Sequence, residues 1–413
     1  MLAALLLEVR SGLFYCVAGV VQGDLERENI MTQSIKDLVA ENEKLASEFL
    51  APNADEIDRT RSFPRKNIQE LGRSGLLGLL VPVEYGGAGA GIAEMAQILE
   101  TMAQACASTA MVTLMHYCGT AVIAAKGSAE LKQHVLPAVV RGEHLITLAF
   151  SEAGSGGHFY VPVSEVQRNG DGLRLTAYKS FVTSAGEAGS YVVSTRKAAA
   201  AGPTDVDLYL VLKSTKGFEV AKPFEGLGLA GNASAPMRLE AVVLDEGARL
   251  GGQGTGFQTM MELVLPHFRI GVAAVSLGIA GAAFQAASAH VSGRKYEHAG
   301  GAALSAIPRV QFLAAEMALE LRSARAYLAE TVRRTTTGDP EAMLDVLGVK
   351  ANASEAALAI VTRAMTLGGG AAYGRRGGLE RNFRDAQAAS VMAPSSDVLK
   401  EFLGKACLGI PLF

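Results

Sequence analysis

The chain has 413 residues, of which 49% are apolar and 19% are charged, and its formal net charge is −3. This length can bury one large core or two to three smaller ones, and the slightly acidic balance excludes the basic surface of a nucleic-acid-binding protein. The mean hydropathy of +0.22 predicts a surface that other copies of the chain partly cover, so we expect a homo-oligomer.

The first 24 residues are apolar but lack a basic start, and two charges, Glu8 and Arg10, interrupt them. We therefore expect neither a signal peptide nor a membrane span, but an upstream extension over 1–30 and a cytoplasmic protein that begins at Met31. The four cysteines show neither CxxC pairing nor histidine neighbours at metal-ligand spacing, which predicts small core residues in a reducing compartment, no disulfide framework and no metal site; they are Cys16, Cys106, Cys118 and Cys407.

Three types of periodicity follow one another along the chain. Apolar residues three and four apart predict an all-helical domain over 31–145, and short β-rich runs predict a small β-barrel or sandwich over 146–250. Long helical stretches rich in Ala and Gly then predict a four-helix bundle over 251–413. The fold class is α+β with several domains, with a hairpin loop at 198–205 and a helix connection at 335–341.

Two motifs suggest a site for a flat or phosphorylated ligand. The segment TLAFSEAGSGGH, residues 147–158, is a strand-like run that opens into a glycine-rich turn after Ser151. Such a turn lets the backbone approach a phosphate or a ring, although a plain β-turn also explains it. Farther on, Phe181 and Thr183 lie two residues apart on a predicted strand and share one face, where they could flank a heterocycle or simply line a half-buried strand.

In the order of its domains and in these motifs, the chain resembles the acyl-CoA dehydrogenase superfamily over about residues 35–407. The matching stretches include GLLGLLVPVEYGGAG, AFSEAGSGG, YKSFVTSAGEAGSYVV, TLGGGAAYG and LERNFRDA. The resemblance implies FAD bound between the β-domain and the bundle of a homotetramer or homodimer. It also implies an acyl thioester substrate, and an electron-transfer flavoprotein or another flavin redox partner.

The resemblance assigns cofactor contacts to nine residues: Ser151, Gly156, Gly157, Phe181, Thr183, Arg294, Gly369, Gly370 and Ser395. In this alignment Phe181 replaces the usual Trp against the flavin ring, Thr183 bonds near N5, and Arg294 reaches the FAD of a neighbouring subunit. Two departures keep FMN or a differently placed dinucleotide as alternatives. The segment after Arg294 is longer than in the family, and Thr366 stands where a Gln is usual.

The catalytic base is the residue that the alignment does not supply. Removal of a proton next to a thioester needs a carboxylate within hydrogen-bond reach. Aligned from the RDA triplet, the usual family Glu falls on Ala393, and the alternate family position falls on Phe268. Neither side chain can accept a proton, so the base is either relocated or absent.

We weigh four side chains for this role and name Asp397 and His116 as the candidates. Asp397 lies four residues past Ala393, but it could equally belong to a helix N-cap, and His116 could be a satisfied core histidine. Beside the alternate position, His267 diverges from its neighbour by about 100° on a helix. Glu262 is more typical of a surface ion pair.

The sequence thus predicts a FAD-dependent oxidoreductase that desaturates an acyl thioester at its α and β carbons and passes hydride to flavin N5. An alternative is a flavin-dependent monooxygenase that uses reduced flavin and O2 on a small molecule. A third hypothesis is a non-catalytic member that keeps FAD for stability. We expect no nucleic acid, no membrane and no metal among its partners.

Overall fold

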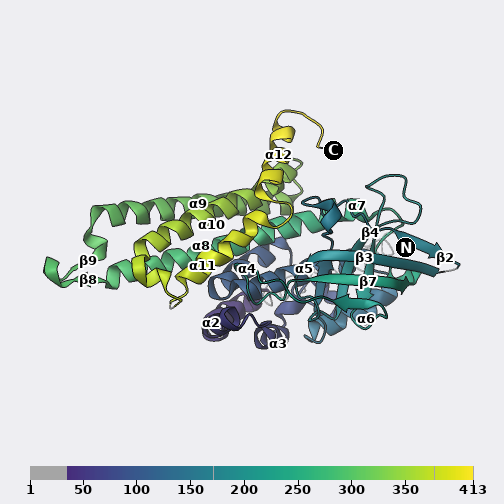
Figure 1. Cartoon of the computed structure of the whole chain (residues 1–413), viewed down its shortest axis with the longest axis horizontal. Helices are drawn as coiled ribbons and strands as arrows, with labels where there is room; N and C mark the ends of the chain where they lie inside the picture. The colour runs from purple at the N-terminus through teal and green to yellow at the C-terminus, as the bar shows by residue number, and fades with distance from the viewer. Residues whose placement is uncertain (1–34, 171, 376, 413) are drawn as a thin grey trace, which may run out of the picture.

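The computed structural model describes residues 35–170, 172–375 and 377–412, and it begins with a helical domain (Figure 1). A first helix continues through a π-helical turn, η1 (Ala46–Leu50), into α2 (Ala51–Thr60). The other helices of this domain are α3 (Arg65–Arg73), α4 (Ile92–Ala105), α5 (Ala107–Lys126) and α6 (Ala129–Val140). Helix α5 is buried along most of its length, so it has no separate polar face toward solvent.

The middle of the chain forms two small sheets. One has the strand order β1 (Ile146–Ala149), β4 (Ser190–Arg196), β5 (Val206–Leu212), with β1 parallel to β4. The other has the order β2 (Val166–Asn169), β3 (Gly172–Val182), β7 (Ala235–Leu244), β6 (Phe218–Val220), with antiparallel pairs throughout. The predicted hairpin loop at 198–205 is confirmed, since it lies between the antiparallel strands β4 and β5.

The C-terminal part is the predicted helical bundle (Figure 1). Its elements are α7 (Gly256–Thr259), η6 (Met260–Val264), α8 (Leu265–Gly293), α9 (Pro308–Thr337), α10 (Ala342–Tyr373), α11 (Leu379–Val391) and α12 (Ser396–Cys407). A short hairpin of β8 (Lys295–Tyr296) and β9 (Ala302–Ala303) closes the end that lies farthest from the sheets. Glycine lets α8 approach the first domain, because a Cβ at Gly271 would lie 2.2 Å from Leu114 of α5.

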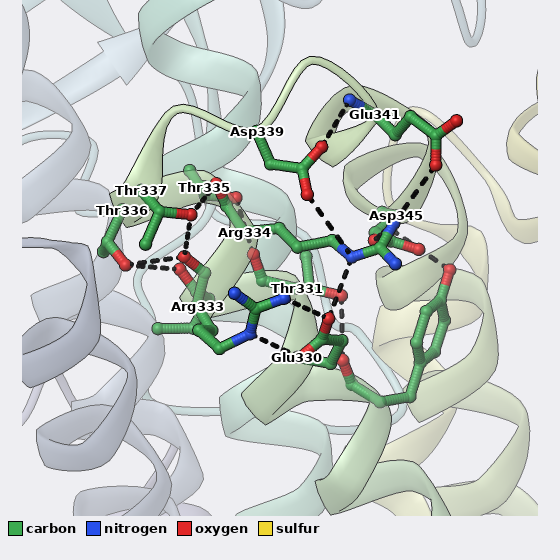
Figure 2. A network of polar contacts seen from close by, with 12 residues as sticks. Glu330, Thr331, Arg333, Arg334, Thr335, Thr336, Thr337, Asp339, Glu341 and Asp345 are labelled. Carbon is green, nitrogen blue, oxygen red and sulfur yellow. Dashed lines mark hydrogen bonds and ion pairs between the residues drawn. The ribbon is translucent and has the colours of Figure 1, made fainter.

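The connection between α9 and α10 is held by ion pairs around Arg334 (Figure 2). Its guanidinium lies 2.9 Å from Glu330 on the same helix and 3.3 Å from Asp345 on α10. Asp339 and Glu341 of the connection lie at 3.9 and 3.6 Å. One cation therefore bridges both helices and the loop between them. The predicted connection is confirmed for 338–341, whereas its first three residues, 335–337, belong to α9.

Helix α11 joins the three parts. Its Arg384 donates to Asp58 of α2 at 2.6 Å, and its Asp385 accepts a hydrogen bond from Leu229 N of the β-domain at 2.6 Å. Asp385 is almost completely buried, and burial raises the pKa of its carboxyl to about 6. Helix α11 thus fixes the first domain and the β-domain against the bundle.

Two stretches are long and apolar enough to cross a membrane by length and composition, namely Ala107–Lys126 and Gly256–Gly293. In the fold 89% and 78% of their most apolar windows are buried, so both serve as core helices. Of the cysteines, Cys106 and Cys118 are buried as predicted, but Cys407 is exposed on the last turn of α12, so that expectation is wrong. Cys16 and the predicted extension lie outside the described residues.

Candidate functional site

The glycine-rich turn after β1 lies against the start of α12. It begins at Ser151, which is partly exposed, and it passes through Gly156, whose φ of 53° and ψ of −126° favour glycine. A Cβ added at Gly157 would lie 3.7 Å from Val398 Cγ2 in the first turn of α12. Ser395 occupies the N-cap position of that helix. The structure therefore brings the turn and the segment around Ser395 together, as the cofactor prediction requires.

A buried ion pair fixes this turn to strand β3. Lys179 Nζ lies 2.6 Å from Glu152 Oε1, and the ammonium also donates to the carbonyl of Ser194 at 2.6 Å. Glu152 Oε2 accepts from the backbone N–H groups of Val163 and Ser164 at 2.7 and 2.9 Å. Burial alone would raise the pKa of Glu152, but Lys179 and the hydrogen bonds lower it further than burial raises it. The carboxylate is thus held ionised at the base of the turn.

Phe181 lies near the end of β3, but Thr183 follows the strand in a turn, so the two residues predicted to share one strand face do not both belong to the strand. Phe181 is 66% exposed and makes an edge-to-face contact with Phe224, with 5.5 Å between ring centroids. Thr183 is nearly buried, and its carbonyl accepts a hydrogen bond from Thr147 Oγ1 at 2.9 Å. Ser180 N donates to Ser151 O at 2.9 Å. The backbone of the turn therefore lies directly beside the residue before Phe181.

These features fit a bound flavin. An exposed aromatic ring is available to cover one face of a flat heterocycle. Two buried hydroxyls that flank the pair, Ser180 Oγ and Ser184 Oγ, have no hydrogen-bond partner among the described residues. At Gly156 a Cβ would meet nothing within 4 Å, so the turn presents open space. The β-domain thus offers an exposed aromatic face, unused donors and open space at the glycine-rich turn, all of which fit FAD.

The remaining predicted contacts lie elsewhere. Arg294 follows the last turn of α8, is exposed, and accepts on its carbonyl from Leu304 N near the β8–β9 hairpin. Gly369 interrupts the last turns of α10 with φ 52° and ψ −139°, and a Cβ at Gly369 or Gly370 would meet nothing within 4 Å. In Figure 1 the β8–β9 hairpin lies at the end of the bundle away from the sheets. Within one copy of the chain, Arg294 therefore lies far from Ser151 and Phe181.

Hydrogen bonds from a buried lysine hold the segment around Ala393. Lys350 on α10 donates hydrogen bonds to the carbonyls of Ala389, Met392 and Pro394 at 2.7, 2.9 and 2.7 Å. Ala393 itself is partly buried and precedes Pro394 through a cis peptide bond. Its methyl group occupies the family's usual carboxylate position in the alignment, and the alternate position, Phe268, is a buried ring of α8.

The two candidate bases have very different surroundings. His116 is completely buried; its Nε2 lies 3.0 Å from Leu77 O, and its Nδ1 accepts from Ile146 N at 3.1 Å. Burial lowers its pKa to about 4. With both ring nitrogens used by the backbone, this neutral imidazole joins α5 to β1 and has no lone pair for a substrate proton.

Asp397 is exposed in the first turn of α12, one residue from the Val398 contact with the glycine-rich turn. The other two side chains that we weighed have local partners on their own helix. His267 Nδ1 lies 2.8 Å from Leu263 O, and Glu262 Oε1 accepts from Gln258 at 2.9 Å. Of the four, Asp397 is the carboxylate that combines exposure with a place beside the predicted cofactor turn.

Sequence reasoning missed Arg269, which follows Phe268 on α8. The residue is 1% exposed, and its Nε and Nη1 have no hydrogen-bond partner among the described residues. A charge inside an otherwise apolar helical run is the signal that could have found it, since such a residue is seldom buried without a reason.

Comparisons with known proteins agree with this geometry. Three family models match the chain: the N-terminal domain of acyl-CoA dehydrogenases over residues 32–143, the middle domain over 147–242 and the C-terminal domain over 254–408. The mitochondrial short-chain specific acyl-CoA dehydrogenase of Bos taurus is 30% identical over 376 residues, which cover 90% of this chain and 88% of that protein. The probable acyl-CoA dehydrogenase FadE25 of Mycobacterium tuberculosis is 29% identical over 88% of this chain and 92% of its own length.

Solved structures show the same fold. The butyryl-CoA dehydrogenase of Megasphaera elsdenii has a TM-score of 0.85 at 24% identity and covers 91% of this chain and 98% of its own. The FAD complex of PigA has a TM-score of 0.84 at 20% identity, with 91% and 98% covered. The predicted three-part fold and the FAD cofactor are confirmed, and with them a flavin-dependent oxidoreductase of the type that acts on CH–CH groups. The chain belongs to the acyl-CoA dehydrogenase family.

Proposed function

We propose that this protein dehydrogenates an acyl-CoA thioester between its α and β carbons. The observation that carries the proposal is the position of the glycine-rich turn after Ser151, which lies beside the residue before Phe181 and meets the first turn of α12, just after Ser395, at Val398. Relatives named for short-chain and cyclohex-1-ene-1-carbonyl thioesters support a CoA thioester as substrate. The comparisons favour this chemistry over the monooxygenase alternative.

Bound FAD would accept the hydride that leaves the β carbon. Ser151, Phe181 and Thr183 would hold its ring, and Gly156 with Gly157 would admit its pyrophosphate. Because Arg294 lies at the far end of the bundle, we propose that it acts on the FAD of a second copy in a homodimer or homotetramer. Gly369 and Gly370 would meet the adenosine half. An electron-transfer flavoprotein as redox partner and a cytoplasmic location complete the proposal.

We further propose Asp397 as the proton acceptor. Its support is its exposure in the first turn of α12 and its place one residue from the Val398 contact with the Gly157 turn. A positioned base accelerates proton transfer by about 10²–10⁴-fold, so its loss should reduce the rate by that factor. The carboxylate of Asp397 would therefore replace the function that Ala393 cannot provide.

Anaerobic titration of the flavin-replete protein with a panel of acyl-CoAs tests the reaction. We expect at least one thioester to bleach the flavin absorbance, and an unchanged spectrum with every thioester would refute the dehydrogenase. Asp397→Asn should slow bleaching by about 10²–10⁴-fold. Adding Ala393→Glu to Asp397→Asn should restore part of the rate, because it returns a carboxylate to the family position. If Asp397→Asn keeps the full rate, Asp397 is not the base.

A further inference from the structure

Phe181 has an aromatic neighbour from a distant part of the chain. Its ring makes an edge-to-face contact with Phe224, with 5.5 Å between the ring centroids and 85° between the ring planes. Both rings keep a large free surface, since Phe181 is 66% exposed and Phe224 is 47% exposed. Edge-to-face is a favoured arrangement of two aromatic rings, and such a pair contributes more than the area that it buries. Phe224 therefore restrains the Phe181 ring on one side and leaves its remaining surface available to a ligand.

The segment 221–234, which joins β6 to β7, holds Phe224 in this place. Its two arms are joined where Phe224 N donates to Ser234 O at 3.3 Å. From the first domain, Arg61 Nη2 donates to Gly226 O at 2.7 Å. A Cβ at Gly226 would lie 2.9 Å from Phe224 Cε2, so glycine lets the ring lie close against its own segment. The backbone is thus held at Phe224 itself and again two residues after it.

The same segment is attached to α11 and to the residues that follow β3. A Cβ at Gly228 would lie 2.3 Å from Arg384 O, so the backbone of the segment packs directly on α11. Ser184, which directly follows Thr183, donates from its backbone N–H to Asn232 O at 2.9 Å. The place of the second ring is therefore set by the first domain, by α11 and by the end of the predicted flavin face.

We propose that Phe224 is a positioning residue of the flavin site, which holds the Phe181 ring in the orientation that covers the flavin. This assignment rests on the proposed contact between Phe181 and FAD. An exposed side chain has several rotamers, and a ligand that fixes one of them loses affinity through the lost rotamer freedom. A neighbour that already restrains the ring removes that cost from cofactor binding, so Phe224 acts on FAD through Phe181.

Dissociation of FAD from the FAD-replete full chain on dilution tests this assignment, with the fluorescence of released flavin as the readout. We expect Phe224→Ala to raise the Kd of FAD about three- to tenfold, the range that corresponds to one aromatic pair. Phe224→Tyr keeps the ring and should keep the affinity. Leu227→Ala is the matched control, because Leu227 lies on the same segment and is 61% exposed. An equal Kd in Phe224→Ala and Leu227→Ala would overturn the proposal.

Coupling between the two rings separates a positioning residue from one that only supports the fold. In a Phe181→Ser background, Phe224→Ala should weaken FAD binding no further, since the ring through which it acts is absent. Iodide quenching of the bound flavin fluorescence should increase in Phe224→Ala and in Phe181→Ser, and it should not increase in Leu227→Ala. If Phe224→Ala weakens binding by the same factor in the wild-type and the Phe181→Ser backgrounds, it does not act through Phe181 and the proposal fails.

These measurements contain no thioester, so they are independent of the dehydrogenase reaction. If the two rings are coupled while no acyl-CoA bleaches the flavin, the positioning role stands and the dehydrogenase fails. If an acyl-CoA bleaches the flavin but the two substitutions act independently on the Kd of FAD, the dehydrogenase stands and the positioning role fails.

Discussion

Lys179 and Glu152 form an ion pair of 2.6 Å in which both side chains are almost completely buried. The pair joins β3, which carries Phe181 next to its last residue, to the turn that begins at Ser151. Removal of one partner leaves the other charge buried without compensation, which typically costs about 3–5 kcal/mol. We therefore expect Lys179→Met to lower the free energy of unfolding by about that amount in urea titrations and to release flavin.

Two controls sharpen this prediction. Lys222→Met removes a lysine whose partner, Glu225, is exposed like itself, so stability should change little. The double variant Lys179→Met with Glu152→Gln removes both buried charges and should recover part of the lost stability. If Lys179→Met behaves like Lys222→Met, the pair does not hold the turn.

His116 should make the protein sensitive to acid. Its pKa is lowered to about 4 in the fold, and an unfolded histidine titrates near 6.5, so the unfolded chain binds more protons between these values. Stability is therefore present above pH 6.5 and falls as the pH decreases toward 4, by about 3 kcal/mol in total. His116→Gln should be less stable at pH 7 but show a flatter profile of unfolding free energy against pH.

A profile of unfolding free energy against pH that is as steep in His116→Gln as in the wild type would contradict this prediction. The same His116→Gln variant also tests the catalytic candidate. Because both ring nitrogens bind the backbone, flavin reduction in the folded variant should not fall by the factor of about 10²–10⁴ that loss of a base causes. A fall of that size would make His116 the base and contradict the structural role.

Periodicity predicted the three parts of the fold because each depends on local patterns. The alternation in GLRLTAYKSFV predicts β3, and the burial of Leu173, Leu175 and Ala177 follows it. The same alternation puts Lys179 on the buried face, so the signal for a buried charge was present in the pattern. It could not reveal the partner, since Glu152 lies 27 residues away and the pairing depends on how the turn folds back.

The site was predicted less completely, for a physical reason. Alignment of motifs gives the order of residue types, but it gives neither the burial of a side chain nor its orientation. It could not show that both ring nitrogens of His116 form hydrogen bonds with the backbone. It also could not show that Arg294 lies at the end of the bundle away from the sheets. Nor could it show that Lys350 donates to the carbonyls on either side of Ala393, because that depends on the packing of α10 against the segment before α12.

Phe181 offers a test of the flavin face. The ring is 66% exposed, so Phe181→Ser should cost the apoprotein little stability. If the ring covers the flavin, its loss removes an aromatic contact of about 0.5–1.5 kcal/mol plus buried apolar area, and FAD should bind roughly tenfold more weakly. Phe312→Ser on α9 is the matched control, with 65% exposure and no predicted cofactor contact. Equal FAD affinity in both variants would remove Phe181 from the site.

Lys350 should control the order of the segment that contains Ala393. Its ammonium donates to three carbonyls between Ala389 and Pro394, and Lys350→Met would leave these groups without their donor. Each unsatisfied buried acceptor costs about 1–3 kcal/mol, so we expect a marked loss of stability and faster amide exchange at Met392 and Ser395 than in wild type. Lys400→Met, which removes an exposed lysine of α12, is the control and should leave that exchange unchanged. Unchanged exchange in Lys350→Met would mean that packing alone fixes the segment.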